Sequence, residues 1–505
     1  MVNKRTFVKN TAVMTATSLL LRTLGIVFRI FISNRVGAEG MGLYQLVFSV
    51  YVLGTAFASA GLTTAVTRLV AEHLARGDRT AAKRALRLAI LLCIGIGALT
   101  AALLYVGAPA IGRLIGDMRA VPALKISGLA LPFIGISGCF KGYFLARRRA
   151  TPPSLSQIAE QLVRIGSILW MLHRHPHASL EETCRIIILG DILSETAAFV
   201  FLWIAYRLDR KQLTAPDRPQ KVPLLRPMLQ IAVPLTAGRY LSTALRTAEN
   251  ILVPARLTVF TGSQAVALEQ FGAVKGMALP LLFFPAAFLV TVSGLLVPEL
   301  SDAHALGNRL QVRRLTERAM HLTVPAAILL GCLFTVLGRP LGRLLYHDDT
   351  VGLLLQILGP LAPVMYLDSV ATGMLKGLGQ QVHSLWYSVA DSTVRIVLIW
   401  FLLPHRGLTG FLFVMLVSNL LTACLSTHRL LTVSGVSMQW GRWVLTPLLI
   451  AVLSGGGWLA LAELLSLPVG WLTVAGGGAI ITGVYLALLP LFGCVSLADR
   501  RRLRT

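Results

Sequence analysis

Long apolar stretches separated by short basic connections dominate this chain of 505 residues. A helix needs about 20 mostly apolar residues to cross the hydrocarbon core of a bilayer. Charged residues make up only 14% of the chain, too few to cover the surface of a soluble protein of this length. The sequence therefore predicts an all-α integral membrane protein with about 14 transmembrane helices. The expected spans are 8–33, 41–70, 86–112, 121–145, 155–172, 185–206, 228–256, 271–298, 319–338, 352–375, 384–403, 408–428, 443–465 and 469–493.

The basic residues are distributed unevenly between the two sides of these spans. Of the 47 Lys and Arg residues, 28 lie on alternate connections and at the two termini, whereas nine lie on the other connections. Because positive residues gather on the cytoplasmic side, both termini are predicted to be cytoplasmic, in a protein of the cell membrane. We interpret most of the net charge of +25 as a surface for anionic membrane lipids, and we expect no nucleic-acid partner.

Two pairs of segments match each other at similar separations. Residues 142–170 match 373–400 with a shift of 231, and residues 21–23 match 245–247 with a shift of 224. These matches predict a duplicated unit of six spans with both copies in one orientation, as in the parallel repeats of many transporters. The expected domains are an N-lobe at 1–206, a basic cytoplasmic linker at 207–227, a C-lobe at 228–430, and two further spans with a basic cytoplasmic tail at 431–505.

The repeat places one acid–arginine pair in each lobe, Glu160 with Arg164 and Asp391 with Arg395. In both pairs the acid precedes the arginine by four residues, which is the favourable order along a helix. One interpretation is a mutually neutralised pair that stabilises its lobe. The other is a carboxylate that senses a proton or a coupling ion, and Glu249 is a further candidate for that role.

Two arginines, Arg22 and Arg29, are seven residues apart on the first expected span, so both point the same way. No acid lies on that span to neutralise them. Arg246 occupies the position equivalent to Arg22 in the repeat, although Glu249 three residues later could pair with it. Guanidinium groups bind phosphate oxygens in a bidentate way, so we predict that Arg22, Arg29 and Arg246 bind an anionic substrate in a basic cavity. Pairing with acids of other helices is the alternative. Lesser candidates are Arg239 and Lys275.

Several kinds of chemistry find no support in the sequence. The six cysteines are scattered and contain no CxxC pair, so they predict neither a disulfide framework nor a metal site. The alternating histidines of residues 173–177 are interpreted as part of a solvated loop. The sequence contains no phosphate-binding loop of the ATPase type, and no long external connection could hold a catalytic site. We therefore expect a protein that is not an enzyme and that needs no cofactor.

Several motifs resemble those of the stage V sporulation protein B family, which belongs to the multidrug/oligosaccharidyl-lipid/polysaccharide exporter superfamily. The most specific match is the S-Q-x-x-E-Q-x-V-R signature at residues 156–164. Further matches lie at 21–29, 36–44, 297–303 and 375–379, and the resemblance covers essentially the whole chain. The chain departs from the family where Phe-Leu-Ala stands at 144–146 in place of Phe-Gln-Gly, followed by a heavy basic run.

The resemblance implies a two-lobed helical bundle that works by alternating access. It also implies a polyprenyl-pyrophosphate-linked glycan as substrate, such as a lipid II-like peptidoglycan precursor for the spore cortex, and cell-wall synthesis proteins as partners. The related lipid II flippases carry functional arginines on their first span, a pattern that Arg22 and Arg29 match. The departure at residues 144–146 would affect cytoplasmic gating or lipid contact.

The leading hypothesis is therefore a flippase that moves a lipid-linked saccharide to the outer leaflet, driven by the membrane potential or an ion gradient. A cation-coupled multidrug exporter is one alternative, which predicts an acidic rather than a basic cavity. A membrane glycan ligase or polymerase is another, but it would need a large external loop. A non-transporting scaffold for sporulation-linked wall synthesis would be indicated by lobes packed without a central cavity.

Overall fold

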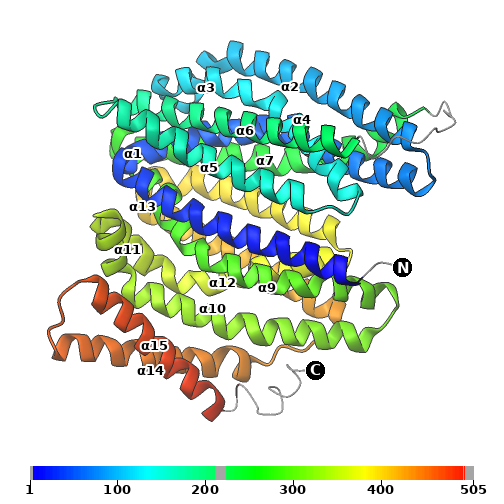
Figure 1. Cartoon of the computed structure of the whole chain (residues 1–505). Helices are drawn as coiled ribbons and strands as arrows, with labels where there is room; N and C mark the ends of the chain where they lie inside the picture. Colours follow the sequence, from blue (N-terminus) through cyan, green and yellow to red (C-terminus); the bar gives the residue numbers. More distant parts are fainter. Residues whose placement is uncertain (1–3, 211–222, 493, 495–505) are drawn as a thin grey trace. The chain divides into compact units, whose positions relative to one another are not determined.

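The computed structural model describes residues 4–210, 223–492 and 494, and nearly all of them lie in helices (Figure 1). No strand occurs within those ranges, so the expected all-α class is confirmed. In chain order the helices are α1 (Lys4–Ala75), α2 (Arg79–Ile115), η1 (Met118–Ala120), α3 (Val121–Ser127), η2 (Gly128–Ala130), α4 (Leu131–Ala146), α5 (Thr151–Arg174), α6 (Leu180–Arg210), α7 (Leu225–Thr261), α8 (Gln264–Phe271), η4 (Gly272–Ala278), α9 (Leu279–Ala305), α10 (Arg309–Tyr346), α11 (Asp349–Leu358), η5 (Gly359–Leu361), α12 (Ala362–Gly377), α13 (Gln381–Ser434), η6 (Gly441–Leu445), α14 (Thr446–Leu464) and α15 (Trp471–Leu491).

Ten helical segments in the described part of the chain are long and apolar enough to cross a membrane, so this is a multi-pass membrane protein. The count of fourteen spans stays a prediction. Two of the ten, α1 and α13, each join two expected spans across one glycine with non-helical angles, Gly37 (φ 73°) and Gly407 (φ 53°). Only glycine adopts such angles without strain. The helices α5 and α7, which carry several charged residues, are not among the ten.

The chain divides into two compact units. Unit 1 consists of Met1–Phe28 and Gly42–Ala255, and unit 2 consists of Arg29–Met41 and Arg256–Thr505. Helix α1 therefore contributes residues to both units, and most of α7 belongs to unit 1. The six-span lobes expected from the repeat stay a prediction, and most of the expected linker at 207–227 lies outside the described residues.

The core of unit 1 is built where α2, α4 and α6 pack against the second half of α1. Leu86, Phe140 and Leu202 are buried together there. Gly142 on α4 lies so close to α1 that a Cβ atom at this position would be 2.6 Å from the carbonyl oxygen of Thr63. Small residues permit such close approach between helices in a membrane, where packing replaces the hydrophobic effect.

The core of unit 2 includes the two final helices. Trp443 and Tyr485 are buried in one apolar cluster with residues of α9, α10 and α12, and the Tyr485 hydroxyl donates a hydrogen bond to the carbonyl of Pro325 (2.9 Å). Figure 1 shows α14 and α15, in orange and red, side by side. The two last helices are therefore an integral part of unit 2.

Candidate functional site

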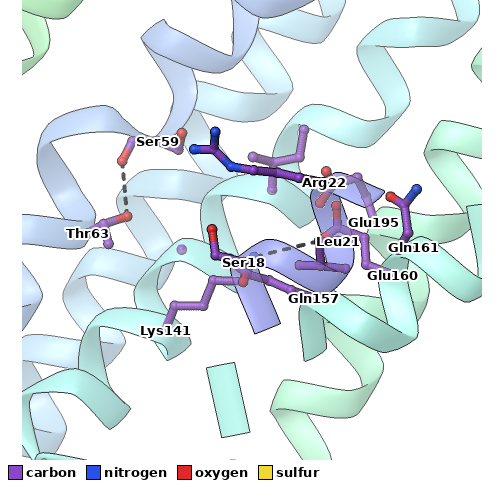
Figure 2. A pocket seen from close by; sticks show the side chains of 12 residues that line it. Ser18, Leu21, Arg22, Ser59, Thr63, Lys141, Gln157, Glu160, Gln161 and Glu195 are labelled. Carbon is purple, nitrogen blue, oxygen red and sulfur yellow. Dashed lines mark hydrogen bonds and ion pairs between the residues drawn. The ribbon is translucent and has the colours of Figure 1, made fainter. Parts of the chain in front are cut away.

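A polar cavity of about 460 Å³ lies inside unit 1 and is lined by helices α1, α4, α5 and α6 (Figure 2). Its charged side chains are Arg22, Lys141, Glu160 and Glu195, so positive and negative groups are equal in number. The sequence led us to expect a basic cavity, and the lining of this cavity is instead balanced. Hydroxyl and amide groups complete the polar lining, from Ser18, Ser59, Thr63, Gln157 and Gln161.

The signature at residues 156–164 places its polar side chains along one face of α5. Pro152 and Pro153 lie in the first turn of this helix, where a missing backbone N–H costs nothing. Glu160 and Gln161 follow Gln157 by three and four residues, which is the spacing that aligns side chains on one helix face. All three line the cavity, and Figure 2 shows Glu160 and Gln161 beside Glu195.

Arg164 lies between two carboxylates in the wall behind the cavity. Its Nη2 is 3.0 Å from Oε1 of Glu160, and its Nε is 2.8 Å from Oδ1 of Asp191 on α6. The Nζ of Lys141 on α4 is 3.7 Å from Oε2 of Glu160. The expected Glu160–Arg164 pair is thus formed, but as part of a four-residue charged network. Asp191 and Lys141 were not expected as its partners; the spacing of Asp191 and Glu195, one helical turn apart, was the available signal.

Arg22 is the one cavity-lining cation without a described ionic partner. Its side chain is exposed to the cavity space, and it forms no ion pair with another described residue. Figure 2 shows it on the side of the cavity where Ser59 lies. A guanidinium held within membrane-spanning helices is costly unless it meets water or an anion. The polar cavity around Arg22 provides space for the water or anion that such a group requires.

Arg29 has a different environment from Arg22, although both are on α1. It belongs to unit 2, where its Nε donates a hydrogen bond to the carbonyl oxygen of Gly276 (2.8 Å) and its Nη2 to that of Lys275 (3.5 Å). The seven-residue spacing correctly indicates a common direction on an ideal helix, but the surroundings of the two arginines differ. In this structure Arg29 binds backbone carbonyls.

Arg246, the third arginine of the expected substrate site, lies on α7 with an exposed side chain. The pairing with Glu249 that the sequence suggests stays a prediction. Glu249 itself is buried, with 2% of its surface exposed. Neither residue lines the unit 1 cavity.

The second acid–arginine pair lies on α13 in unit 2. The Nη2 of Arg395 is 2.7 Å from Oδ2 of Asp391. Ser418, on the second half of α13, accepts hydrogen bonds from Nε (2.9 Å) and Nη2 (2.6 Å) of Arg395 and donates one to Asp391. The two expected pairs are therefore both formed, one within a charged network and the other with a hydroxyl group. No cluster of three or more potential metal ligands occurs among the described residues.

Comparison with known sequences identifies related membrane proteins. The family model for polysaccharide biosynthesis proteins matches residues 7–293. Stage V sporulation protein B of Bacillus subtilis (strain 168) is 24% identical, over 99% of this chain and 98% of its own. The lipid II flippase MurJ of the same organism is 22% identical, over 77% of this chain and 76% of its own.

Comparison with solved structures identifies the fold. The lipid II flippase MurJ in an inward closed conformation is similar with a TM-score of 0.68 and 14% identity, covering 97% of this chain and 99% of that one. A multidrug resistance MATE family transporter in an inward-facing conformation is similar with a TM-score of 0.62 and 14% identity, covering 84% of this chain and 100% of that one. The helices of this chain thus follow a fold that flippases and drug exporters share.

Proposed function

Because this chain belongs to the polysaccharide biosynthesis protein family, we propose that it is a flippase for a polyprenyl-pyrophosphate-linked saccharide. Relatives named as a sporulation protein and a lipid II flippase support this assignment, and a lipid II-like peptidoglycan precursor for the spore cortex is the substrate we favour. The cargo would move from the cytoplasmic to the outer leaflet by alternating access, in a protein whose termini are both cytoplasmic.

The observation that carries this proposal is the position of Arg22 in the unit 1 cavity. Its charge has no described carboxylate partner, whereas Lys141 and Arg164 are both paired. A pyrophosphate offers several anionic oxygens that suit the planar fork of a guanidinium, and such charge-assisted bonds are stronger than neutral ones. Arg29 and Arg246 stay predicted ligands of the same anion.

Flipping of fluorescent lipid II in proteoliposomes tests the proposal. Arg22→Ala should reduce the flipping rate about tenfold or more, because it removes a charge-assisted hydrogen bond to the cargo. The matched control is Arg313→Ala, which removes an arginine that pairs with Glu317 on the surface of α10 (2.8 Å) and should leave the rate unchanged. Equal flipping rates in the wild type and the Arg22 variant would contradict the assignment of Arg22 as a ligand of the cargo.

A cation-coupled multidrug exporter is the second candidate, favoured by the carboxylates of Glu160 and Glu195 in the cavity lining. The same proteoliposomes distinguish the two functions when an organic cation such as ethidium replaces the lipid. Ethidium transport that depends on Glu195, together with no flipping of lipid II, would replace the flippase proposal. The same carboxylates are candidates for coupling flipping to an ion gradient, whereas Glu249 and Asp391 do not line this cavity.

A further inference from the structure

A single π-helical turn interrupts the helix that α8, η4 and α9 form in unit 2. Along η4 the helix widens, and the N–H of Leu279 donates to the carbonyl of Val274, five residues back instead of four. Pi-helical turns inside α-helices are rare and occur frequently at functional sites. The turn lies in a segment long and apolar enough to cross the membrane, where backbone groups without partners are especially costly.

The sequence explains why this turn needs a hydrogen-bond donor from another helix. Pro280 is the second residue of α9 and has no N–H. In a regular α-helix the N–H of residue 280 would donate to the carbonyl of residue 276, so the carbonyl of Gly276 loses its normal donor. The structure supplies a substitute, because Nε of Arg29 lies 2.8 Å from that carbonyl oxygen.

One more contact attaches the same turn to α10, and another attaches residues 29–41 to α10. The hydroxyl of Tyr346, at the end of α10, donates to the carbonyl of Met277 (3.1 Å). Asn34, five residues after Arg29, donates to the carbonyl of Leu345 beside that tyrosine (2.8 Å). Residues 29–41, the end of α10 and η4 thus form one hydrogen-bonded group within unit 2, which we call the clasp.

Glycine is required at the centre of the clasp. A Cβ atom added to Gly276 would lie 2.8 Å from Cβ of Met41, closer than side chains approach in real structures. The missing side chain lets residues 29–41 approach the turn, and the buried carbonyl of Gly276 is left accessible to Arg29. The centre of the clasp is therefore the hydrogen bond between the Gly276 carbonyl and the Arg29 guanidinium.

We propose that Arg29 closes the clasp by replacing the missing donor of Pro280, and that an anionic phosphate group of the cargo opens it by drawing the guanidinium away. Loss of the Arg29 bond leaves the Gly276 carbonyl without a donor, so η4 must change its winding. This would couple cargo binding to a change in the membrane-spanning segment that carries Lys275. The coupling step rests on the proposed flippase function, whereas the closed clasp does not.

A double-mutant cycle tests the clasp in the full chain without any cargo. Pro280→Ala restores an N–H for the Gly276 carbonyl, so the effect of Arg29→Gln should depend on this background. In nanodiscs we expect Arg29→Gln to lower the apparent Tm by about 2–4 °C in the wild type and by less than half of that in Pro280→Ala. The matched control is Arg22→Gln, on the same helix but in unit 1, whose effect should be the same in both backgrounds. An equal drop for Arg29→Gln in both backgrounds would overturn the clasp.

Hydrogen–deuterium exchange of the wild-type protein tests the opening step, and the Arg29→Gln variant serves as a comparison. Saturating inorganic pyrophosphate is the probe, and it should speed exchange of the amides at residues 272–282 about two- to tenfold, the range expected for loss of one hydrogen bond. In Arg29→Gln these amides should already exchange fast and not respond. Unchanged wild-type exchange would overturn the opening step while leaving the flipping result with Arg22 variants intact. If the double-mutant cycle gives the expected result but the wild-type protein does not flip lipid II, only the proposed function is overturned.

Discussion

The two acid–arginine pairs have the same sequence spacing but different surroundings. In unit 1, Arg164 contacts two carboxylates, and one of these, Glu160, also contacts Lys141. In unit 2, Arg395 contacts Asp391 and the hydroxyl of Ser418. A spacing of four residues therefore sets up the pair, but neighbouring helices decide whether it becomes part of a charged network. Glu160 of the unit 1 pair also lines the cavity.

Removal of the arginines should give the largest difference between the units. Arg164→Ala leaves Glu160 and Asp191 without their shared cation in a partly buried site, so we expect a loss of about 3–5 kcal/mol in the free energy of unfolding. Arg395→Ala should cost less, about 1.5–3 kcal/mol, because Ser418 still donates to the remaining carboxylate. Chemical unfolding in detergent micelles measures both. Equal losses of unfolding free energy in the two variants would show that the charged network in unit 1 adds no stability.

Removal of the acids should instead cost more unfolding free energy in unit 2 than in unit 1. Asp391→Asn removes the carboxylate that lies 2.7 Å from Nη2 of Arg395, and we expect a loss of about 2–3 kcal/mol. Glu160→Gln leaves Arg164 with Asp191, so the expected loss is about 1 kcal/mol. The same unfolding measurement applies. A larger loss for Glu160→Gln than for Asp391→Asn would mean that Asp191 does not substitute for Glu160.

The smallest expected effect is that of the hydroxyl group in unit 2. Ser418→Ala removes one donor to Asp391 and one acceptor for Arg395, and it should cost about 1 kcal/mol. Ser388→Ala on the same helix is the control, since Ser388 bonds only to the carbonyl of Ser384 one turn earlier (3.0 Å). Its effect should stay within about 0.5 kcal/mol. Indistinguishable variants would show that Ser418 is not needed by the pair.

The sequence was sufficient for those features that depend on local spacing. Apolar length predicted the membrane helices, and the four-residue spacing predicted both pairs. The partners Asp191 and Ser418 could not be predicted, because the rotation of one helix against the next depends on packing across the whole unit. The same limit applies to the charge of the cavity, where Glu195 and Lys141 arrive from separate helices.

Arg29 shows where a sequence signal existed but was incomplete. Pro280 alone indicates that the carbonyl four residues earlier needs another donor. It does not indicate which donor, since Arg29 is 247 residues away from Gly276. From the sequence, an arginine in an apolar helix indicates a substrate ligand, because substrate binding is one way to satisfy its charge and hydrogen bonds. A hydrogen bond to a backbone carbonyl that lacks its helical donor is another way to satisfy the arginine.

The break at Gly407 has a practical consequence for anyone who labels this protein. The two halves of α13 follow each other with no intervening loop, and a Cβ atom at Gly407 would lie 2.4 Å from the ring of Phe260. Epitope tags, protease sites and reporter fusions need a solvent-exposed tip that can absorb extra residues. The junction between 403 and 408 offers none, so topology mapping should place its reporters in the turn at 305–309, where Leu306 and Gly307 are exposed.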